Sequence, residues 1–340
     1  MDAFYVSVEL RRRPELRGRP VIVAGSGPRA VVTTASYEAR RFGVGSAMPA
    51  ARARRLCPDG VYLPPDHPYY REASREVMAL VRAVTPAVEV IGLDEAYLDL
   101  SGMPAPRAEM RRLVIEIERQ TGLHASIGIG PNKLVSKVAS DAEKPRGFVC
   151  LTSEQARARF ADAPCGLIPG IGPKTAERLR ACGLPTLGRL ATAPAPELAA
   201  RFGPRLGSEL RRRARFEDDA PVTEQRKVVS ESRETTFDVD VAGLPALEPI
   251  LAQLVSELCA TLERQQRRGR TIAIKVRLDD FSTHTRARTL GGPIATADQV
   301  RPVALDLLRR FDPPRPVRLL GVRVAGLETP TADQQLTLAL

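Results

Sequence analysis

Two adjacent carboxylates, Asp94 and Glu95, stand in the middle of the largely apolar segment VIGLDEAYLDL at 90–100. The flanking residues are typical of a strand, and burying two neighbouring charges is unfavourable unless cations pair with them. A divalent metal is the natural partner, because hard oxygen ligands suit Mg²⁺ and a two-metal site can stabilise both the entering and the leaving oxygen of a phosphoryl transfer. The alternative is a polar hairpin turn that happens to be acidic, and the spacing of the pair alone does not decide between them.

The segment around this pair, 20–130, alternates short strand-like runs with amphipathic helices. Apolar residues at helical spacing predict two helices. These residues are Ala73, Val77, Leu80, Val81 and Val84 in the first helix and Met110, Leu113, Val114 and Ile117 in the second. Strand-like runs occupy 20–25, 30–36, 88–100 and 125–130. The mixture predicts an α+β layer that carries the two carboxylates.

After this layer the chain changes character twice. Residues 158–216 hold short helices broken by Gly and Pro, which indicates a separate helical module, and the acidic segment EDDAPVTEQ at 217–225 is typical of a linker. Beyond the linker the expected order is strand, helix, strand, strand, helix, strand, a ferredoxin-like β-α-β-β-α-β arrangement. The expected bounds are 226–238, 244–264, 271–281, 285–290, 297–311 and 315–327.

The helical module contains a glycine-rich turn in the segment GLIPGIGPKTAERLRACG at 166–183. Gly170 and Gly172 precede a predicted helix, and Lys174 follows within its first turn. Glycine lets the backbone approach a phosphate closely, and the amides that follow donate to it without reading base sequence. The pattern predicts a helix-hairpin-helix that binds DNA, with a simple helix–helix turn as the alternative; a second glycine turn and a strongly basic helix follow at 201–215.

Basic residues alternate with apolar ones in the last predicted sheet. Lys275 and Arg277 lie between isoleucine, valine and leucine positions, as expected for a half-buried strand. Arg286 and Arg288 repeat the spacing in the next strand, and Arg323 stands in the last one. We expect these cations to line one DNA-binding face of the sheet, although a merely solvated face would show the same pattern.

The bulk composition favours a polyanionic partner. The 340 residues include 51 Lys and Arg against 40 Asp and Glu, a net charge of +11, which places nucleic acid first among partners. Codon bias in a GC-rich genome is the alternative source of this charge. The five cysteines and three histidines are scattered, so a zinc site is not expected. The sequence shows neither a membrane span nor a leader, and we expect a cytoplasmic protein.

Several separate motifs resemble those of the Y-family DNA polymerases, in the same order along the chain. They are YEARRFGV at 37–44, SAMP at 46–49, LDEAYLD at 93–99 and SKVASDAEKPRG at 136–147. The resemblance implies a right-hand polymerase with a ferredoxin-like palm, small fingers, a helix-hairpin-helix thumb and a ferredoxin-like little finger. The implied bounds are palm 1–10 and 66–157, fingers 11–65, thumb 158–216, linker 217–225, little finger 226–328 and tail 329–340.

The resemblance also implies an activity, namely DNA-directed DNA synthesis past damaged template bases. A primer 3′-hydroxyl attacks the α-phosphorus of a dNTP, with Asp94 and Glu95 holding two Mg²⁺ ions and Glu95 as the active-site acid. No segment is left for a proofreading exonuclease. The groups expected at the triphosphate are Tyr37, Arg40, Lys144 and the nearby Thr34. For Arg40 a planar fork suits phosphate oxygens, while a surface salt bridge is the alternative.

Two further features of the family concern the choice of nucleotide. Tyr5 matches the position whose ring packs where a ribose 2′-hydroxyl would project, so it is expected to select deoxynucleotides; taken alone it would be one more core aromatic. The fingers segment 34–50 consists mostly of small residues. Fingers built in this way cover the nascent base pair loosely, which predicts tolerance of damaged templates and low fidelity.

The last six residues resemble the short motif by which such polymerases bind a sliding clamp. A polar side chain and spaced leucines would fill pockets on the partner ring, whereas a floppy amphipathic tail is the alternative. The motif residues are Gln335, Leu336, Leu338 and Leu340. We otherwise expect a monomer whose partners are primer–template DNA and dNTP.

The start of the chain departs from the family pattern. The family has an acid, one residue and a second acid, and the first acid is a metal ligand; here Met1 takes the middle place and Asp2 the place of the second acid. We therefore expect a truncated first palm strand whose neighbours have unpaired backbone groups.

Three explanations compete: a mis-assigned start or truncated chain, a defective enzyme, or Asp2 as a weak replacement ligand. The rival function is a catalytically impaired, polymerase-like scaffold that binds DNA or the clamp. A helix-hairpin-helix repair nuclease or glycosylase is a more distant alternative.

Overall fold

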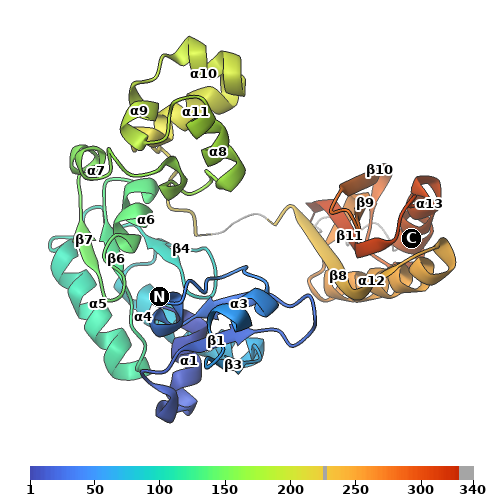
Figure 1. The fold of residues 1–340 in the computed structure, drawn as a ribbon, viewed down its shortest axis with the longest axis horizontal. Helices are drawn as coiled ribbons and strands as arrows, with labels where there is room; N and C mark the ends of the chain where they lie inside the picture. The colour runs from blue at the N-terminus through green and yellow to red at the C-terminus, as the bar shows by residue number, and fades with distance from the viewer. Residues whose placement is uncertain (225–227, 329–340) are drawn as a thin grey trace, which may run out of the picture. The chain divides into compact units, whose positions relative to one another are not determined.

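The computed structural model describes residues 1–224 and 228–328, which the residue contacts divide into two units. The first unit comprises Met1–Gly25 and Val31–Arg226, and the second comprises Ser26–Ala30 and the chain from Lys227 onwards. Figure 1 shows strands and helices mixed in both. No helix in these described ranges is long and apolar enough to cross a membrane.

A small three-stranded sheet lies in the first part of the first unit. Its order is β2-β1-β3, with β1 antiparallel to β2 and parallel to β3. The strands are β1 (Val21–Ala24), β2 (Val32–Ala35) and β3 (Val61–Leu63), and the helices around them are α1 (Phe4–Arg12), η1 (Pro14–Leu16), α2 (Tyr37–Arg40) and α3 (Ala50–Leu56). The predicted strands at 20–25 and 30–36 are confirmed as β1 and β2.

The two helices predicted from apolar spacing are confirmed as α4 (His67–Val84) and α5 (Pro106–Thr121). The Asp66 side chain caps α4 by accepting from the backbone N–H of Tyr69 at 3.2 Å. The apolar faces of the two helices share one buried cluster with α1, because side chains three and four residues apart lie on the same helix face. This cluster also packs against the two strands on either side of the carboxylates.

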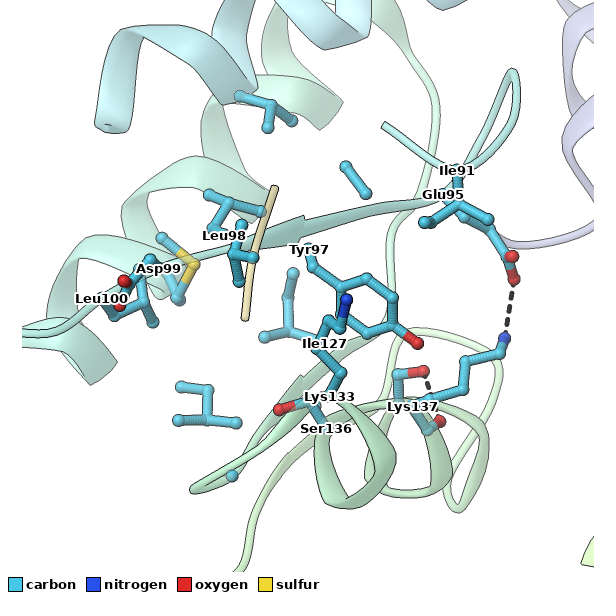
Figure 2. A pocket seen from close by; sticks show the side chains of 18 of the residues that line it. Ile91, Glu95, Tyr97, Leu98, Asp99, Leu100, Ile127, Lys133, Ser136 and Lys137 are labelled. Carbon is cyan, nitrogen blue, oxygen red and sulfur yellow. Dashed lines mark hydrogen bonds and ion pairs between the residues drawn. The ribbon is translucent and has the colours of Figure 1, made fainter. Parts of the chain in front are cut away.

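Those strands form two separate pairs rather than one sheet. β4 (Val88–Val90) and β5 (Ala96–Leu98) are antiparallel, while β6 (Ile127–Ile129) and β7 (Phe148–Cys150) are parallel. The predicted strand at 88–100 is therefore wrong as a single element, because residues 91–95 turn the chain back. A groove of about 650 Å³ lies between β5 and β6, and Tyr97, Leu98 and Ile127 are among the side chains that line it (Figure 2).

Helix α6 (Lys133–Asp141) lies against β6 at very close range. A Cβ atom at Gly128 would come within 2.0 Å of the Ser136 carbonyl oxygen, so only glycine allows this approach. The inner face of α6 is buried through Leu134, Val135 and Val138. The helix is thereby fixed between the β6–β7 pair and the helical module.

The helical module predicted at 158–216 is confirmed as a set of short helices that Figure 1 shows gathered together. Its elements are η2 (Cys165–Leu167), α8 (Pro173–Ala181), α9 (Leu187–Thr192), α10 (Ala195–Phe202) and α11 (Pro204–Ala214), and α7 (Ser153–Arg159) precedes them. Their leucines and isoleucines form one buried cluster that also includes α6 side chains. The module and α6 thus share a core.

In the second unit the predicted β-α-β-β-α-β order is confirmed, and both helix spans agree. The elements are β8 (Ser230–Val241), α12 (Leu244–Arg264), β9 (Arg268–Leu278), β10 (Thr283–Ile294), α13 (Ala297–Phe311) and β11 (Val317–Glu328). The sheet order is β10-β9-β11-β8 with every pair antiparallel. Ile272, Ile274 and Val276 are buried with the apolar sides of α12 and α13, so the two helices cover one face of the sheet.

Candidate active site

Asp94 and Glu95 lie at the tip of the β4–β5 hairpin. The N–H of Ile91 donates to the Glu95 carbonyl at 2.9 Å and closes the turn. Ser74 Oγ on α4 donates to the Leu93 carbonyl at 2.5 Å and holds the turn against that helix. The shape is that of the polar hairpin turn considered as an alternative, but this turn is anchored, and both of its carboxylates line the groove. Figure 2 shows Glu95 of this pair, linked to Lys137.

A row of alternating charges connects Glu95 with α6 and the loop after it. Lys137 Nζ donates to Glu95 Oε1 at 2.6 Å and lies 3.1 Å from Asp141 Oδ2. Lys144 Nζ lies 2.7 Å from Asp141 Oδ1. Sequence reasoning singled out Lys144 and missed Lys137 and Asp141, which are four residues apart and lie on the same side of α6.

The surroundings of Asp94 make its charge less favourable than in water. Burial raises the pKa of the Asp94 carboxyl, and the negative charge of Glu95 adds to this effect, while the Met1 amino group and Lys144 oppose it. The Met1 amino group also donates to the backbone carbonyl of Asp94 at 2.8 Å. A carboxylate deprived of water in this way is stabilised by any further cation that reaches it.

The donor set of the hairpin fits magnesium. Mg²⁺ is commonly held by one or two carboxylates, with substrate phosphates and water as its other ligands, and Asp94 and Glu95 are adjacent hard-oxygen donors of that kind. Within residues 1–224 and 228–328, no three Asp, Glu, His or Cys side chains form a metal-binding group. The protein's own contribution is therefore the pair, and its role as metal ligand stays a prediction.

Asp2 is placed by a different set of contacts. Its carboxylate is buried, with 3% of the residue exposed, and accepts from Ser126 Oγ at 2.8 and 3.0 Å and from the backbone N–H of Arg146 at 2.8 Å. Both oxygens are thus occupied in tying the start of α1 to the loops before β6 and β7. This arrangement does not favour Asp2 as a replacement metal ligand.

Three of the four residues expected at the triphosphate, Thr34, Tyr37 and Arg40, lie on β2 and α2. The Arg40 guanidinium stacks over the Tyr37 ring at 4.6 Å, and its Nε donates to the Ala35 carbonyl at 3.0 Å. These contacts of Arg40 are with a ring and a backbone carbonyl rather than with a carboxylate, so they do not favour the surface salt bridge considered for it. Thr34 is buried on β2, with 8% of the residue exposed.

The phenol of Tyr37 is an unsatisfied group. Its Oη is buried and no hydrogen bond of regular geometry reaches it from the described residues, although the Arg40 guanidinium lies close enough to interact with it. A ligand oxygen that accepts the hydroxyl proton would satisfy it. Burial raises the Tyr37 pKa, the charges of Asp2 and Asp141 add to that, and Arg40 opposes it. Tyr37 therefore lies within electrostatic reach of the α6 charges.

Tyr5 lies on α1 and belongs to a small cluster of aromatic rings. It stacks on Tyr70 with ring centroids 4.5 Å apart and meets His67 edge-on at 6.2 Å. Burial raises the pKa of Tyr5, and the charge of Asp94 raises it further, which places the ring near the hairpin. Sequence reasoning found Tyr5 but not Tyr70.

The glycine turn of the helical module has the predicted form. Gly170 has φ +89°, a left-handed value that favours glycine, and Gly172 is the N-cap residue of α8, which begins at Pro173. A Cβ at Gly172 would meet nothing within 4 Å, so this side of the turn is open. Lys174 is exposed beside it, and Arg213 Nη1 on α11 donates to the Pro169 carbonyl at 2.6 Å. That the turn contacts DNA stays a prediction.

The expectation that five cations line one sheet face is wrong for two of them. Residues directly opposite in an antiparallel pair share a face, and Arg286 and Arg288 lie opposite the buried Ile274 and Ile272. Both therefore point to the helix side, where Arg286 stacks over Phe311 at 4.8 Å and Arg288 pairs with Asp306. The reason is the register set by the β9–β10 turn.

The other predicted cations lie on the face of the sheet that α12 and α13 do not cover, called the open face below. Lys275 and Arg277 alternate with the buried residues of β9, and Arg323 lies opposite Ala273, which is on the same side. Thr283 and Thr285 lie opposite Arg277 and Lys275 and add hydroxyl groups. This side of the sheet therefore combines positive charge with small polar side chains and one carboxylate, since Lys275 Nζ donates to Glu234 Oε2 at 2.9 Å.

Comparison with known proteins identifies the family. Residues 1–141 match the model of the impB/mucB/samB family, and residues 228–338 match that of its C-terminal domain. The DNA polymerase IV of Methanoculleus marisnigri is 44% identical, covering 96% of this chain and 93% of that protein. The DNA polymerase IV of Alkalilimnicola ehrlichii is also 44% identical, covering 100% and 97%.

Solved structures agree with the sequence relatives. A Y-family DNA polymerase chimera, Dbh-Dpo4(243-245)-Dbh, has a TM-score of 0.86 at 26% identity, covering 97% of this chain and 98% of the other. An insertion ternary complex of Dbh DNA polymerase has a TM-score of 0.66 at the same identity and coverage. The relatives and the fold together define a DNA-directed DNA polymerase. The chain belongs to the impB/mucB/samB family of Y-family DNA polymerases.

Proposed function

We propose that the protein extends a primer across damaged template bases, by attack of the 3′-hydroxyl on the α-phosphorus of a dNTP. The observation that carries this proposal is the anchored Asp94–Glu95 turn, which faces the charged row of α6 across the end of the groove. Relatives named DNA polymerase IV support the same activity. We also propose the implied division into palm, fingers, thumb, linker and little finger at the bounds given above.

Asp94 and Glu95 would hold two Mg²⁺ ions, which supply charge neutralisation and a more acidic 3′-hydroxyl when bound. The chain's own side chains position the nucleotide. Lys144 and Arg40 neutralise the triphosphate, and the Tyr37 hydroxyl donates to it. Such fixed donors act by orientation and electrostatics rather than by covalent chemistry.

Tyr5 would exclude ribonucleotides, because its ring lies near the carboxylate turn and is backed by Tyr70. The fingers carry two short α-helices, α2 with four residues and α3 with seven, and the three-residue η1, on a sheet of short strands. A cover of this size constrains the nascent pair weakly, so we propose low fidelity without proofreading. Thr34 lies in the same sheet and would support the nucleotide side of the site.

DNA would be held by contacts to phosphates at two places. The amides of the Gly170–Gly172 turn, with Lys174, would bind one stretch of backbone, and Lys275, Arg277 and Arg323 would bind another. The clamp motif Gln335, Leu336, Leu338 and Leu340 lies outside the described residues. We propose clamp binding through it, a monomeric protein and a cytoplasmic location.

The carboxylate pair is tested by primer extension with Mg²⁺ and dNTPs. Glu95→Gln and Asp94→Asn should each slow extension by roughly 100-fold or more, because removing a ligand takes away several kcal/mol of transition-state stabilisation. Glu109→Gln, an exposed carboxylate on α5, is the matched control and should extend like the parent chain. Unchanged extension by Glu95→Gln would refute the assignment.

A second candidate is a polymerase-like protein that binds DNA with impaired catalysis. The observation in its favour is that the described ranges hold no group of three metal-binding side chains around the pair. The same assay separates the two functions when primer–template affinity is measured alongside. Tight DNA binding with no incorporation by the parent chain would favour the scaffold.

A further inference from the structure

Three charged side chains on and after α6 form one connected row. Asp141 is the last residue of the helix, Lys137 stands four residues before it and Lys144 three residues after it. The carboxylate of Asp141 holds both ammonium groups, at 3.1 Å for Lys137 and 2.7 Å for Lys144. Lys137 continues the row to Glu95 at 2.6 Å (Figure 2).

Asp141 is well suited to hold these groups in place. Its short side chain projects from a helix whose N-terminus is capped by Asn132, at 2.9 Å from the Val135 N–H, and whose inner face is buried. Lysine side chains are long and lose considerable rotamer freedom when they are ordered. A short carboxylate on a fixed helix can therefore orient two flexible cations.

The electrostatics of the row agree with this role. Burial alone would raise the pKa of Asp141, but the hydrogen bond from Lys144 and the charge of Lys137 outweigh it, so the pKa is lowered. Burial would likewise lower the pKa of Lys137, but its contacts with Glu95 and Asp141 raise it. The neighbouring charges thus favour the ionised form of each of these two groups.

Lys144 depends on this single ion pair. Among the described residues Asp141 is its one ion-pair partner, and 23% of the Lys144 side chain is exposed. Lys144 lines the same groove as Asp94 and Glu95, so its ammonium group lies on the side of the site that faces the turn. Without Asp141 the ammonium group would be free to leave this side of the site.

We propose that Asp141 is a positioning residue for nucleotide binding, which fixes the Lys144 ammonium for the triphosphate and ties it through Lys137 to Glu95. The inference rests on the proposed function, in which Lys144 contacts the triphosphate. Asp141 itself acts through Lys144. It therefore matters only as long as Lys144 is present.

A double-mutant cycle on dNTP binding tests this dependence. The dissociation constant of dNTP is measured by fluorescence on a complex with a dideoxy-terminated primer and Mg²⁺, so that no chemistry is needed. Asp141→Ala should weaken dNTP binding by about 5- to 10-fold, and Lys144→Ala by at least as much. The double variant should bind within about twofold of Lys144→Ala, because the effects of residues that touch each other are not additive.

Two further variants complete the design. Glu143→Ala removes a neighbouring carboxylate that pairs with Arg159 at 2.8 Å, and its dNTP affinity should equal that of the parent chain. Asp141→Asn keeps the side-chain shape and should weaken binding in the same direction, which covers the case in which Asp141→Ala does not fold.

Three results would overturn the proposal: unchanged affinity in both Asp141 variants, additive losses in the double variant, or unchanged affinity in Lys144→Ala. Failure of the proposed function looks different, since the parent complex would then bind no dNTP at all.

Discussion

The ring of Tyr5 rests on the ring of Tyr70, with centroids 4.5 Å apart and planes inclined by 25°. Tyr70 is fully buried on α4, and its hydroxyl donates to the buried carboxylate of Glu9 at 2.8 Å. Glu9 is held in turn by Arg12 through two hydrogen bonds of 2.8 and 3.0 Å. The ring of Tyr5, which is expected to exclude ribose, is therefore supported by the fixed ring of Tyr70.

Replacing Tyr70 should weaken the discrimination between deoxyribonucleotides and ribonucleotides. In Tyr70→Leu the Tyr5 ring loses its stacking partner, and we expect incorporation of ribonucleotides relative to deoxynucleotides to rise by about 10-fold. The measurement is the ratio of kcat/KM for rNTP and dNTP opposite the same template base. Tyr69→Leu, whose neighbouring ring contacts Arg12 instead, should leave the ratio unchanged. An unchanged ratio in Tyr70→Leu would mean that Tyr5 does not need the stack.

The Tyr70 hydroxyl should also make stability depend on alkaline pH. Burial raises the pKa of Tyr70 well above its usual value, and the hydrogen bond to Glu9 acts in the same direction. Because the folded pKa exceeds the unfolded pKa of about 10, this stabilisation is complete below that pH and is lost as pH rises further. Tyr70→Phe should therefore lower the free energy of unfolding at pH 8 by about 1–2 kcal/mol.

The control for this effect is Tyr69→Phe. Urea denaturation at pH 8 and pH 11 should show a smaller loss of stability on raising the pH in Tyr70→Phe than in the parent chain, whereas Tyr69→Phe should follow the parent. Equal pH dependence in all three proteins would contradict the raised pKa.

The close approach of α6 to β6 predicts a strong effect of one methyl group. In Gly128→Ala the new Cβ would lie 2.0 Å from the Ser136 carbonyl oxygen and 2.3 Å from the Ser140 nitrogen, so the backbone must move. We expect a loss of about 2–4 kcal/mol in the free energy of unfolding, as for other overpacked core positions. Gly172→Ala, with nothing within 4 Å of the new Cβ, should change stability by less than about 0.5 kcal/mol. Thermal or urea denaturation of both variants provides the comparison.

The sequence predicted most of the elements because periodicity is a local property. The spacing of Val77 and Val81 on α4, or of Leu113 and Ile117 on α5, shows which helix face is buried. It predicted less of the site. The stacking of Tyr70 on Tyr5 joins residues 65 positions apart and left no local pattern. Lys137 and Asp141 carried a helical spacing, but their link to Glu95 depends on how α6 meets the hairpin.

The error at Arg286 and Arg288 has a different cause. Alternation shows that two residues of one strand lie on the same face. It does not show whether that face is the buried or the exposed one of the neighbouring strand, because this depends on the register. The register depends on the length of the β9–β10 turn, where the Leu278 N–H donates to the Ser282 carbonyl. One residue more or less in the turn would have placed both arginines beside Lys275.

DNA-binding measurements can distinguish the open face of this sheet from the face that the helices cover. Lys275→Ala, Arg277→Ala and Arg323→Ala each remove a cation from the open face, and each should weaken primer–template binding by several-fold at physiological salt. The slope of log affinity against log salt should fall by about one for each phosphate that the variant no longer neutralises. Because these cations do not read bases, the losses of affinity should be similar for unrelated template sequences.

The matched controls are Arg286→Ala and Arg288→Ala, which remove the same charge from the helix side. Arg286 and Arg288 lie on the helix side, against Phe311 and Asp306, so neither variant should change the salt slope by as much as about half a unit. Each control variant should instead lower the free energy of unfolding, by up to about 1 kcal/mol for the loss of a partly exposed pair. Equal losses of DNA affinity from both sets of variants would show that position on the sheet does not matter, and that net charge alone attracts the DNA.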